Sequence, residues 1–223
     1  MPKVTEEYFI KKKALITQAA YNVCLRKPVE MVTMSDVIEE SGLSQGGIYR
    51  FYQDLDEILS DMITKMRSDY NIIDEVEKLT VDENASFAQV THRICDILAS
   101  VMEQHLLDIQ KINFDLTVMA INEPERAEKI MGGIKGRGNL EYLSTKLMPK
   151  LAKACEEEKL KSEARPEDIF NFISAAYGGI EMSCIVSACY RKDINGNRYM
   201  PKPLFDTLAT TIILLFGGED NEQ

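Results

Sequence analysis

The sequence lacks most of the motifs on which enzyme active sites and metal centres are built. It has only two histidines, His92 and His105, which lie thirteen residues apart and belong to no HExxH motif. It contains no GxSxG nucleophile motif and no GxxxxGK(S/T) loop for binding phosphate. These absences predict a protein that is not an enzyme and that uses no metal ion and no cofactor.

Disulfide pairs and membrane segments are also missing. The five cysteines form no CxxC pair, and their odd number favours free, buried thiols in a reducing compartment. Cys184 and Cys189 are the best candidates for a redox pair, but a spacing of five does not bring two side chains together on a helix. No uncharged apolar run of about 18 residues occurs. The first residues mix acids and lysines where a signal peptide is apolar, so we expect a cytoplasmic protein with no membrane partner.

Positive charge is scarce over the chain as a whole. The 26 Lys and Arg residues face 36 Asp and Glu residues, for a net charge of −10, which opposes binding to nucleic acid because phosphate attracts basic side chains. Residues 1–52, however, hold seven basic and six acidic residues, and the remainder holds 19 and 30. The acidity therefore lies outside the N-terminal segment, which remains free to bind DNA in a salt-sensitive way.

Apolar residues recur with a helical period along nearly the whole chain. Ile16, Ala19, Ala20 and Val23 fall on one face of a helix, and six further stripes of this kind lie between residues 58 and 215. No stretch alternates apolar and polar residues between hairpin turns, as strands would. The sequence therefore predicts an all-α protein of about nine helices.

Proline and glycine mark the ends of these helices. Pro28 closes the first helix, and Pro124, Pro166 and Pro201 each follow a turn and begin the next helix. Four glycines between residues 132 and 138 weaken any helix there, which predicts a kink or a loop.

The most informative stretch, residues 33–59, contains two short helices joined by a tight turn. Thr33 is a residue type that caps helix N-termini, and apolar residues follow it at helical spacing. Gly42 permits a left-handed backbone at the helix end, and Ser44 caps a second helix of residues 44 to about 51. This arrangement is typical of a helix-turn-helix, whose second helix enters the major groove of DNA. An ordinary helical hairpin with a polar outer face is the alternative.

The outer surface of the second short helix suits contact with DNA. A hydroxyl and an amide lie at its N-terminus, and two glycines allow the backbone to approach closely. A phenol and a guanidinium follow, which bind phosphate or guanine. The residues in question are Ser44, Gln45, Gly46, Gly47, Tyr49 and Arg50.

This segment resembles the N-terminal domain of the TetR family of transcriptional regulators. The matching positions extend over about 45 residues with their spacing intact, and the core pattern Gly-apolar-Ser-x-Gly-x-Ile-Tyr is the most specific part. They are Ile16 to Ala20, Thr33, Val37, Ile38, Ser41 to Ser44, Gly46, Ile48, Tyr49, Tyr52, Ile58 and Leu59. The rest of the chain resembles the family only in having about six more helices.

The resemblance implies roles for individual residues. Contacts to backbone phosphates would come from Thr33, Tyr49 and Tyr52. Contacts to base edges would come from Gln45, Gly47 and Arg50. Further phosphate contacts, or an arm in the minor groove, would come from Lys11, Lys12 and Lys13, for which a solvated helix start is an equally good interpretation.

Two positions depart from the family pattern. Pro28 stands where the family usually has glycine, in a turn that tolerates the change. Leu55 stands where the family usually has a lysine near phosphate, and it lies between Asp54 and Asp56. Acidic residues stabilise a helix N-terminus but would repel DNA if they face it, so we expect a reduced but real affinity for DNA.

The resemblance also implies a C-terminal all-α domain that binds a small-molecule effector and forms a homodimer. We divide the chain into a DNA-binding domain (1–53) and a ligand-binding and dimerisation domain (54–223), connected by a helix over 54–78. Helices over 166–190 and 202–217 would form the dimer, with packing inside one chain as the competing account. The candidates for lining an effector pocket are Met102, Phe114, Met119 and Tyr177.

The predicted function is regulation of transcription in response to a ligand. The dimer would bind a palindromic operator in double-stranded DNA, most simply as a repressor, and a small molecule would release it. The alternative is a helical protein–protein adaptor of the same fold whose DNA binding is weakened or lost, because Leu55 replaces the family's lysine.

Overall fold

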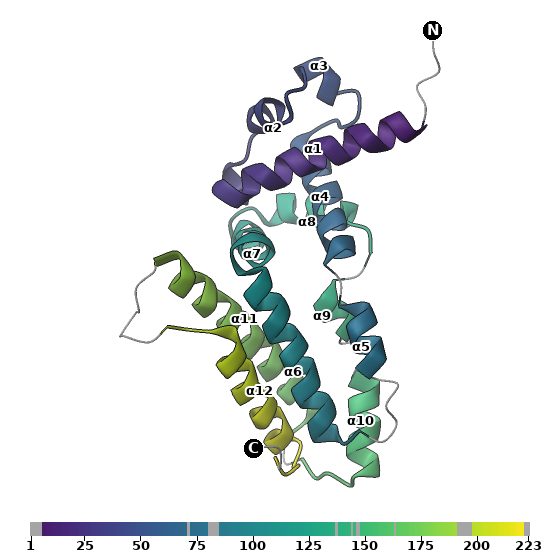
Figure 1. The fold of residues 1–223 in the computed structure, drawn as a ribbon, viewed down its shortest axis with the longest axis vertical. Coiled ribbons are helices and arrows are strands. Elements are labelled where there is room, and N and C mark those ends of the chain that lie inside the picture. The colour runs from purple at the N-terminus through teal and green to yellow at the C-terminus, as the bar shows by residue number, and fades with distance from the viewer. Residues whose placement is uncertain are drawn as a thin grey trace. The chain divides into compact units, whose positions relative to one another are not determined.

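The computed structural model describes residues 6–70, 72–79, 85–136, 138–143, 145, 148–162, 164–190 and 198–220. Within these residues every regular element is helical (Figure 1), so the predicted all-α fold class is confirmed. The elements are α1 (Glu6–Arg26), η1 (Val29–Met31), α2 (Met34–Ser41), α3 (Gln45–Ile48), α4 (Leu55–Asp69), α5 (Ile73–Leu79), α6 (Phe87–Gln104), η2 (Leu106–Gln110), α7 (Lys111–Asn122), α8 (Pro124–Gly133), α9 (Asn139–Tyr142), α10 (Met148–Glu157), α11 (Pro166–Tyr190) and α12 (Pro201–Leu215). The described residues form more segments than the nine or so expected, because several are only one turn long.

The chain divides into two compact units. The first unit consists of Met1–Tyr70 and Lys111–Gly136, and the second consists of Asn71–Gln110 and Arg137–Gln223. The first unit thus joins the N-terminal helices to α7 and α8, which are distant in sequence. The two units are compact parts of the fold and do not by themselves indicate function. The predicted boundary at residue 53, between a DNA-binding domain and an effector domain, therefore stays a prediction.

The first unit is built around α1 and α4. Helix α1 packs against α2, α4 and α7, and α4 packs along α8. The periodic stripe of α1 is buried as predicted, with Ile16 and Ala20 fully enclosed. Ile48, Ile58 and Leu59, from α3 and α4, are also completely buried, which attaches the two short N-terminal helices firmly to this core.

The second unit centres on the packing of α6 against α12. Its core includes Phe87 and Met102 of α6 and Phe205 of α12. The ring of Tyr177 on α11 meets that of Phe205 edge-on, with centroids 5.9 Å apart. Over Glu167–Cys189, α11 is long and apolar enough to cross a membrane by length and composition alone. One such helix is weak evidence for a membrane span, because the core helix of a soluble protein passes the same test.

The predicted single helix over 54–78 is wrong, because the structure interrupts it. Helix α4 ends at Asp69, and Tyr70 closes it by donating its N–H to Met66 O at 3.0 Å. The N–H of Ile72 instead donates to Asn139 Oδ1 at 3.2 Å, and α5 begins at the next residue. The apolar period runs through this point, so periodicity could not reveal the break, nor the acceptor 67 residues away that Ile72 N–H binds there.

The proline and glycine predictions are confirmed. Helices α8, α11 and α12 each begin with proline, at Pro124, Pro166 and Pro201. Gly133 is the last residue of α8, and Gly136 has a left-handed backbone with φ of +80° in the loop that follows.

The thiols behave largely as expected. Cys24, Cys95 and Cys184 are buried, and desolvation raises the pKa of the first two to about 12 and that of the third to about 11. Cys189 is exposed, so the expectation of burial is wrong there. The side chain of Cys155 lies outside the described part.

Candidate nucleic-acid interface

The first helix of the motif is held at both ends by local interactions. Thr33 and Asp36 form a reciprocal capping box: Asp36 N–H donates to Thr33 Oγ1 at 3.3 Å, and Thr33 N–H donates to Asp36 Oδ2 at 2.8 Å. Gly42 ends α2 with φ of +65°. A left-handed residue at this point turns the chain sharply, as the sequence predicts.

Helix α3 begins as expected but is shorter than predicted. The Ser44 hydroxyl accepts a hydrogen bond from Gly47 N–H at 3.2 Å and so caps the helix. Ile48, which is fully buried, anchors α3 to the core. The helix ends at Ile48, and Tyr49 and Arg50 lie in the turn that follows. This turn stays close to helical geometry, because Tyr49 keeps a right-handed helical backbone and Tyr52 N–H donates to Ile48 O at 3.2 Å.

The outer face of α3 is open to solvent. Gln45, Gly46, Tyr49 and Arg50 are exposed, and the Tyr49 ring retains 48% of its accessible surface. A Cβ added at Gly46 would meet no atom within 4 Å, so the fold of the chain does not itself require glycine there. The Arg50 guanidinium makes no ion pair with any residue that the structure describes. These side chains are available to a partner.

Tyr52 and Lys13 are engaged inside the protein. Tyr52 is 2% exposed, and its hydroxyl donates to Asp61 Oδ2 at 3.0 Å. Lys13 Nζ lies 3.0 Å from the same oxygen and 4.5 Å from the centroid of the Tyr52 ring. Desolvation, followed by the charge of Asp61, raises the pKa of Tyr52. Phosphate contacts by these two residues stay predictions, because each would have to leave Asp61.

The other two lysines of the first helix make only weak contacts with residues that the structure describes. Lys11 pairs with Glu7 at 2.6 Å, but both side chains are about three-quarters exposed. Lys12 Nζ lies 5.8 Å from the centroid of the Tyr8 ring. Exposed pairs of this kind are weak, so both lysines can exchange these partners for phosphate.

The acids at the start of α4 are not free. Asp54 caps the helix by accepting Glu57 N–H at 3.0 Å, and it also lies 2.7 Å from Lys129 Nζ of α8. Asp56 lies 2.9 Å from Arg126 Nε and 3.1 Å from Lys129 Nζ. The hydrogen bond from Lys129 holds the pKa of Asp54 below its usual value. Neither cation can be predicted from the sequence, since nothing in a local pattern relates residues 70 or more positions apart.

The charge of the first unit is nearly balanced. It contains 13 basic and 15 acidic residues, whereas the second unit contains 13 and 21. Most of the net charge of −10 therefore belongs to the second unit, in agreement with the charge division along the sequence.

The four candidate effector residues do not come together in one unit. Met102 and Tyr177 belong to the second unit, whereas Phe114 and Met119 belong to the first. Met102 and Met119 are fully buried core residues. None of the four lines any of the three cavities that the structure describes, so an effector site built from them stays a prediction.

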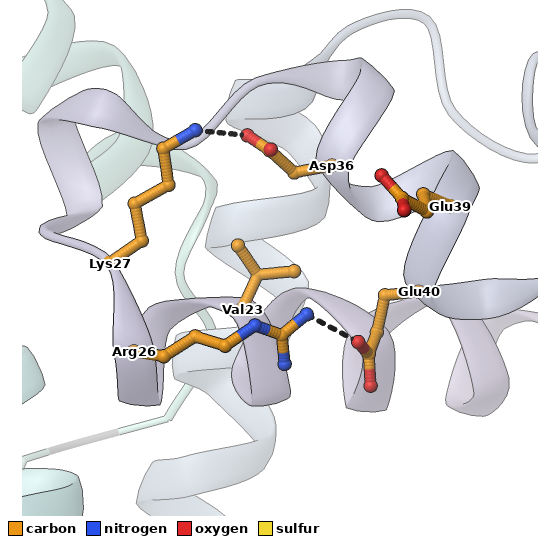
Figure 2. Close-up of a pocket in the computed structure, with 6 residues that line it drawn as sticks. All are labelled: Val23, Arg26, Lys27, Asp36, Glu39 and Glu40. Atoms are coloured by element: carbon orange, nitrogen blue, oxygen red, sulfur yellow. Dashed lines mark hydrogen bonds and ion pairs between the residues drawn. The ribbon is translucent and has the colours of Figure 1, made fainter.

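The largest of these cavities, about 470 Å³, lies between α1 and α2 (Figure 2). Two ion pairs line it, Lys27–Asp36 at 2.7 Å and Arg26–Glu40 at 2.5 Å. The hydrogen bonds from Lys27 and Thr33 lower the pKa of Asp36 to about 2. Small-molecule pockets are mostly apolar, so this charged cavity is a poor candidate for an effector site. The ion pairs that line it connect the end of α1 to α2.

Sequence comparison relates part of the chain to a known regulator. No protein-family model matches the chain. A segment of 62 residues is 45% identical to the uncharacterised HTH-type transcriptional regulator YfiR of Bacillus subtilis (strain 168). The match covers 28% of this chain and only 30% of that protein.

Structural likeness extends over nearly the whole chain. A candidate TetR-family transcriptional regulator from Mesorhizobium loti matches 93% of this chain and 96% of its own, with a TM-score of 0.60 and 15% identity. Salmonella enterica GusR matches 96% of this chain and 98% of its own, with a TM-score of 0.59 and 15% identity. A third match, a candidate TetR-family regulator from Rhodococcus sp., has a TM-score of 0.58 and 13% identity. The resemblance seen in the sequence is therefore confirmed at the level of the fold: this chain has the all-α fold of the TetR-family transcriptional regulators.

Proposed function

We propose that the protein regulates transcription by binding double-stranded DNA through α3 and the turn after it. The observation that carries this proposal is the local geometry of α2 and α3. Capping by Thr33 and Ser44 and the left-handed Gly42 present a short helix whose outer face is exposed and unpaired. The N-terminus of such a helix reaches base edges in the major groove.

The proposed contacts follow from exposure. Tyr49 and Thr33 would bind backbone phosphates, and Arg50 and Gln45 would reach base edges. Lys11, which is exposed, and Lys12, which is half-buried, would add phosphate contacts from α1. Further contacts would come from the start of α3, through Ser44, Gly46 and Gly47.

We also propose that the protein acts as a homodimer through α11 and α12. Phe172 and Met182, both on α11, are each 47% exposed, and a Cβ at Gly178 or Gly179 would meet no atom within 4 Å. An apolar helix with this much open surface favours a second copy as its partner. A two-fold dimer would also match a palindromic operator, whose half-sites repeat at a fixed spacing.

Dimerisation can be tested by sedimentation. Phe172→Asp is expected to convert a dimer to monomers. Leu107→Asp is the matched control, because Leu107 is also half exposed, in η2 of the same unit. A wild-type protein that sediments as a monomer at micromolar concentration would count against the dimer.

Repression, release by a small-molecule effector and residence in the cytoplasm complete the proposal. The α11 face favours an interface over a membrane span because Glu181 places an ionisable side chain in the middle of the helix. A screen of compounds for release of labelled DNA would identify the effector.

The decisive experiment is an unbiased selection of bound DNA fragments with the purified full-length protein. A palindromic consensus is expected. Replacing Tyr49 and Arg50 together by Ala should weaken binding to the selected DNA at least about tenfold. The control replaces Arg198 and Tyr199 by Ala, an adjacent and exposed pair in the second unit.

The alternative, an adaptor with lost DNA binding, predicts a different result. The observation that favours it is Leu55, which offers no charge at the start of α4. An adaptor would enrich no fragment at low salt, and the Tyr49 and Arg50 substitutions would then change nothing in DNA binding.

A further inference from the structure

The start of α4 is joined to α8 by a cluster of ion pairs. The two helices lie side by side within the first unit (Figure 1). Arg126 bonds Asp56, and Lys129 bridges Asp56 and Asp54, at distances between 2.7 and 3.1 Å. The side chains of Arg126 and Asp56 retain only 23% and 16% exposure. This α4–α8 clasp, defined as these four residues, is therefore largely enclosed at its centre.

The backbones of the two helices come unusually close beside the clasp. A Cβ on Gly133 would lie 2.7 Å from Ser60 Oγ and 2.9 Å from Ser60 Cβ, which no real side chain tolerates. Ser60 Oγ donates to Ile130 O at 2.8 Å, and Thr64 Oγ1 accepts Lys135 N–H at 2.9 Å. The contact thus continues for the next turns of α4, so its first turn cannot shift independently of α8.

The clasp also sets the charge next to the DNA-binding turn. Asp54, Asp56 and Glu57 stand in the first turn of α4, and residues 49–54 alone connect that turn to α3. Acidic side chains this close to α3 in the sequence would repel the phosphates of bound DNA if no cation balanced their charge. The two cations of α8 offset two of the three charges, and the third carboxylate accepts the N–H of Gln53 at 2.8 Å.

We infer that Arg126 and Lys129 are positioning residues of the DNA-binding surface: they hold and neutralise the first turn of α4 and thereby orient α3, without touching DNA. This inference rests on the proposed function. It gives α8, a helix outside the sequence motif, an indirect part in DNA binding, and it explains how the chain does without the lysine that Leu55 replaces.

The first test removes one acid of the clasp. Electrostatics alone predicts that Asp56→Asn binds DNA more tightly, because a negative charge near phosphate has gone. The inference predicts the opposite, a loss of about tenfold in affinity for the selected DNA, because the largely enclosed Arg126 loses its ion pair across to α4. Arg126 then keeps only the longer contact to Glu123 of its own helix, at 3.4 Å. Glu128→Gln is the control: Glu128 is an exposed acid beside Lys129 on α8, and its neutralisation should leave affinity unchanged or slightly raised.

The second test separates positioning from direct contact. Loss of a phosphate contact lowers the slope of log affinity against log salt by about 1. Lys129→Gln should weaken binding while keeping the wild-type slope. The exchanged double variant Asp56→Arg with Arg126→Asp should recover most of the affinity that Asp56→Arg alone loses, although that single variant carries more positive charge.

Three results would overturn the inference. The first is that folded Asp56→Asn binds the selected DNA as tightly as the wild type or more tightly. The second is that Lys129→Gln lowers the slope of log affinity against log salt. The third is that the double variant recovers none of the affinity lost by Asp56→Arg. Circular dichroism checks that each variant folds. If Asp56→Asn does not fold, Lys129→Gln replaces it, because the Lys129 side chain is half exposed and its substitution disturbs the core less. A wild-type protein that selects no DNA overturns the proposed function itself, which distinguishes the two failures.

Discussion

The hydroxyl of Tyr52 donates to the carboxylate of Asp61 at 3.0 Å, in a site that leaves Tyr52 only 2% exposed. Lys13 shares the same carboxylate oxygen. The three residues link α1 and α4 to the end of the turn that follows α3. A residue expected to bind phosphate is thereby part of the support for its neighbours.

Tyr52→Phe is expected to lower the free energy of unfolding by about 1 kcal/mol, because the carboxylate loses a hydrogen bond. Urea unfolding measures this. The salt dependence of DNA binding should keep its wild-type slope, since the hydroxyl is committed to Asp61. A slope lower by about 1 would show instead that Tyr52 leaves Asp61 to reach phosphate.

Gly42 and Gly46 are expected to respond differently to alanine. Gly42→Ala should destabilise the protein by about 1–2 kcal/mol, because the left-handed backbone is unfavourable for a side chain. Gly46→Ala should leave stability equal or higher, because a Cβ there meets open space within α3, yet weaken DNA binding by holding the backbone away. Thermal melting and a DNA titration of both variants would check this. Equal melting temperatures for the two would contradict it.

The close contact of α4 with α8 predicts a strong effect at Gly133. Gly133→Ala should cost about 1–3 kcal/mol, because its Cβ would overlap Ser60 and force the helices apart. Gly132→Ala is the matched control one residue earlier in the same helix, where a Cβ meets nothing within 4 Å. It should stabilise the protein by up to about 1 kcal/mol. Adding Ser60→Gly to Gly133→Ala should restore part of the loss.

Glu181 predicts a pH dependence of stability. Burial raises the pKa of this carboxyl from 4.5 to about 7. Between these values the folded protein holds a proton that the unfolded chain releases, so the free energy of unfolding falls as the pH rises towards about 7 and is level above it. Glu181→Gln should remove this part of the slope. Urea unfolding at about pH 5 and about pH 8 measures it, with Glu167→Gln, an exposed acid of the same helix, as the control.

Features whose cause lies within a few residues could be predicted before the structure was known. The capping box of Thr33, the left-handed Gly42 and the cap at Ser44 are local interactions, and so are the prolines that begin α8, α11 and α12. Their geometry follows from residue type and spacing, and the structure confirms each. The helical period likewise determined the all-α class, because it reports which face of each segment is buried.

Which side chains remain free to bind a partner depends on contacts between helices that are far apart in the sequence. The pairing of Asp56 with Arg126 joins residues 70 positions apart, and Asn139 ends the α4–α5 continuity from 67 positions away. Tyr52 is withdrawn from the surface by Asp61 across a helix–helix contact. Periodicity describes one helix at a time, whereas charge compensation and burial depend on what packs against that helix. The acids that the sequence set against DNA binding are for that reason balanced in the folded protein.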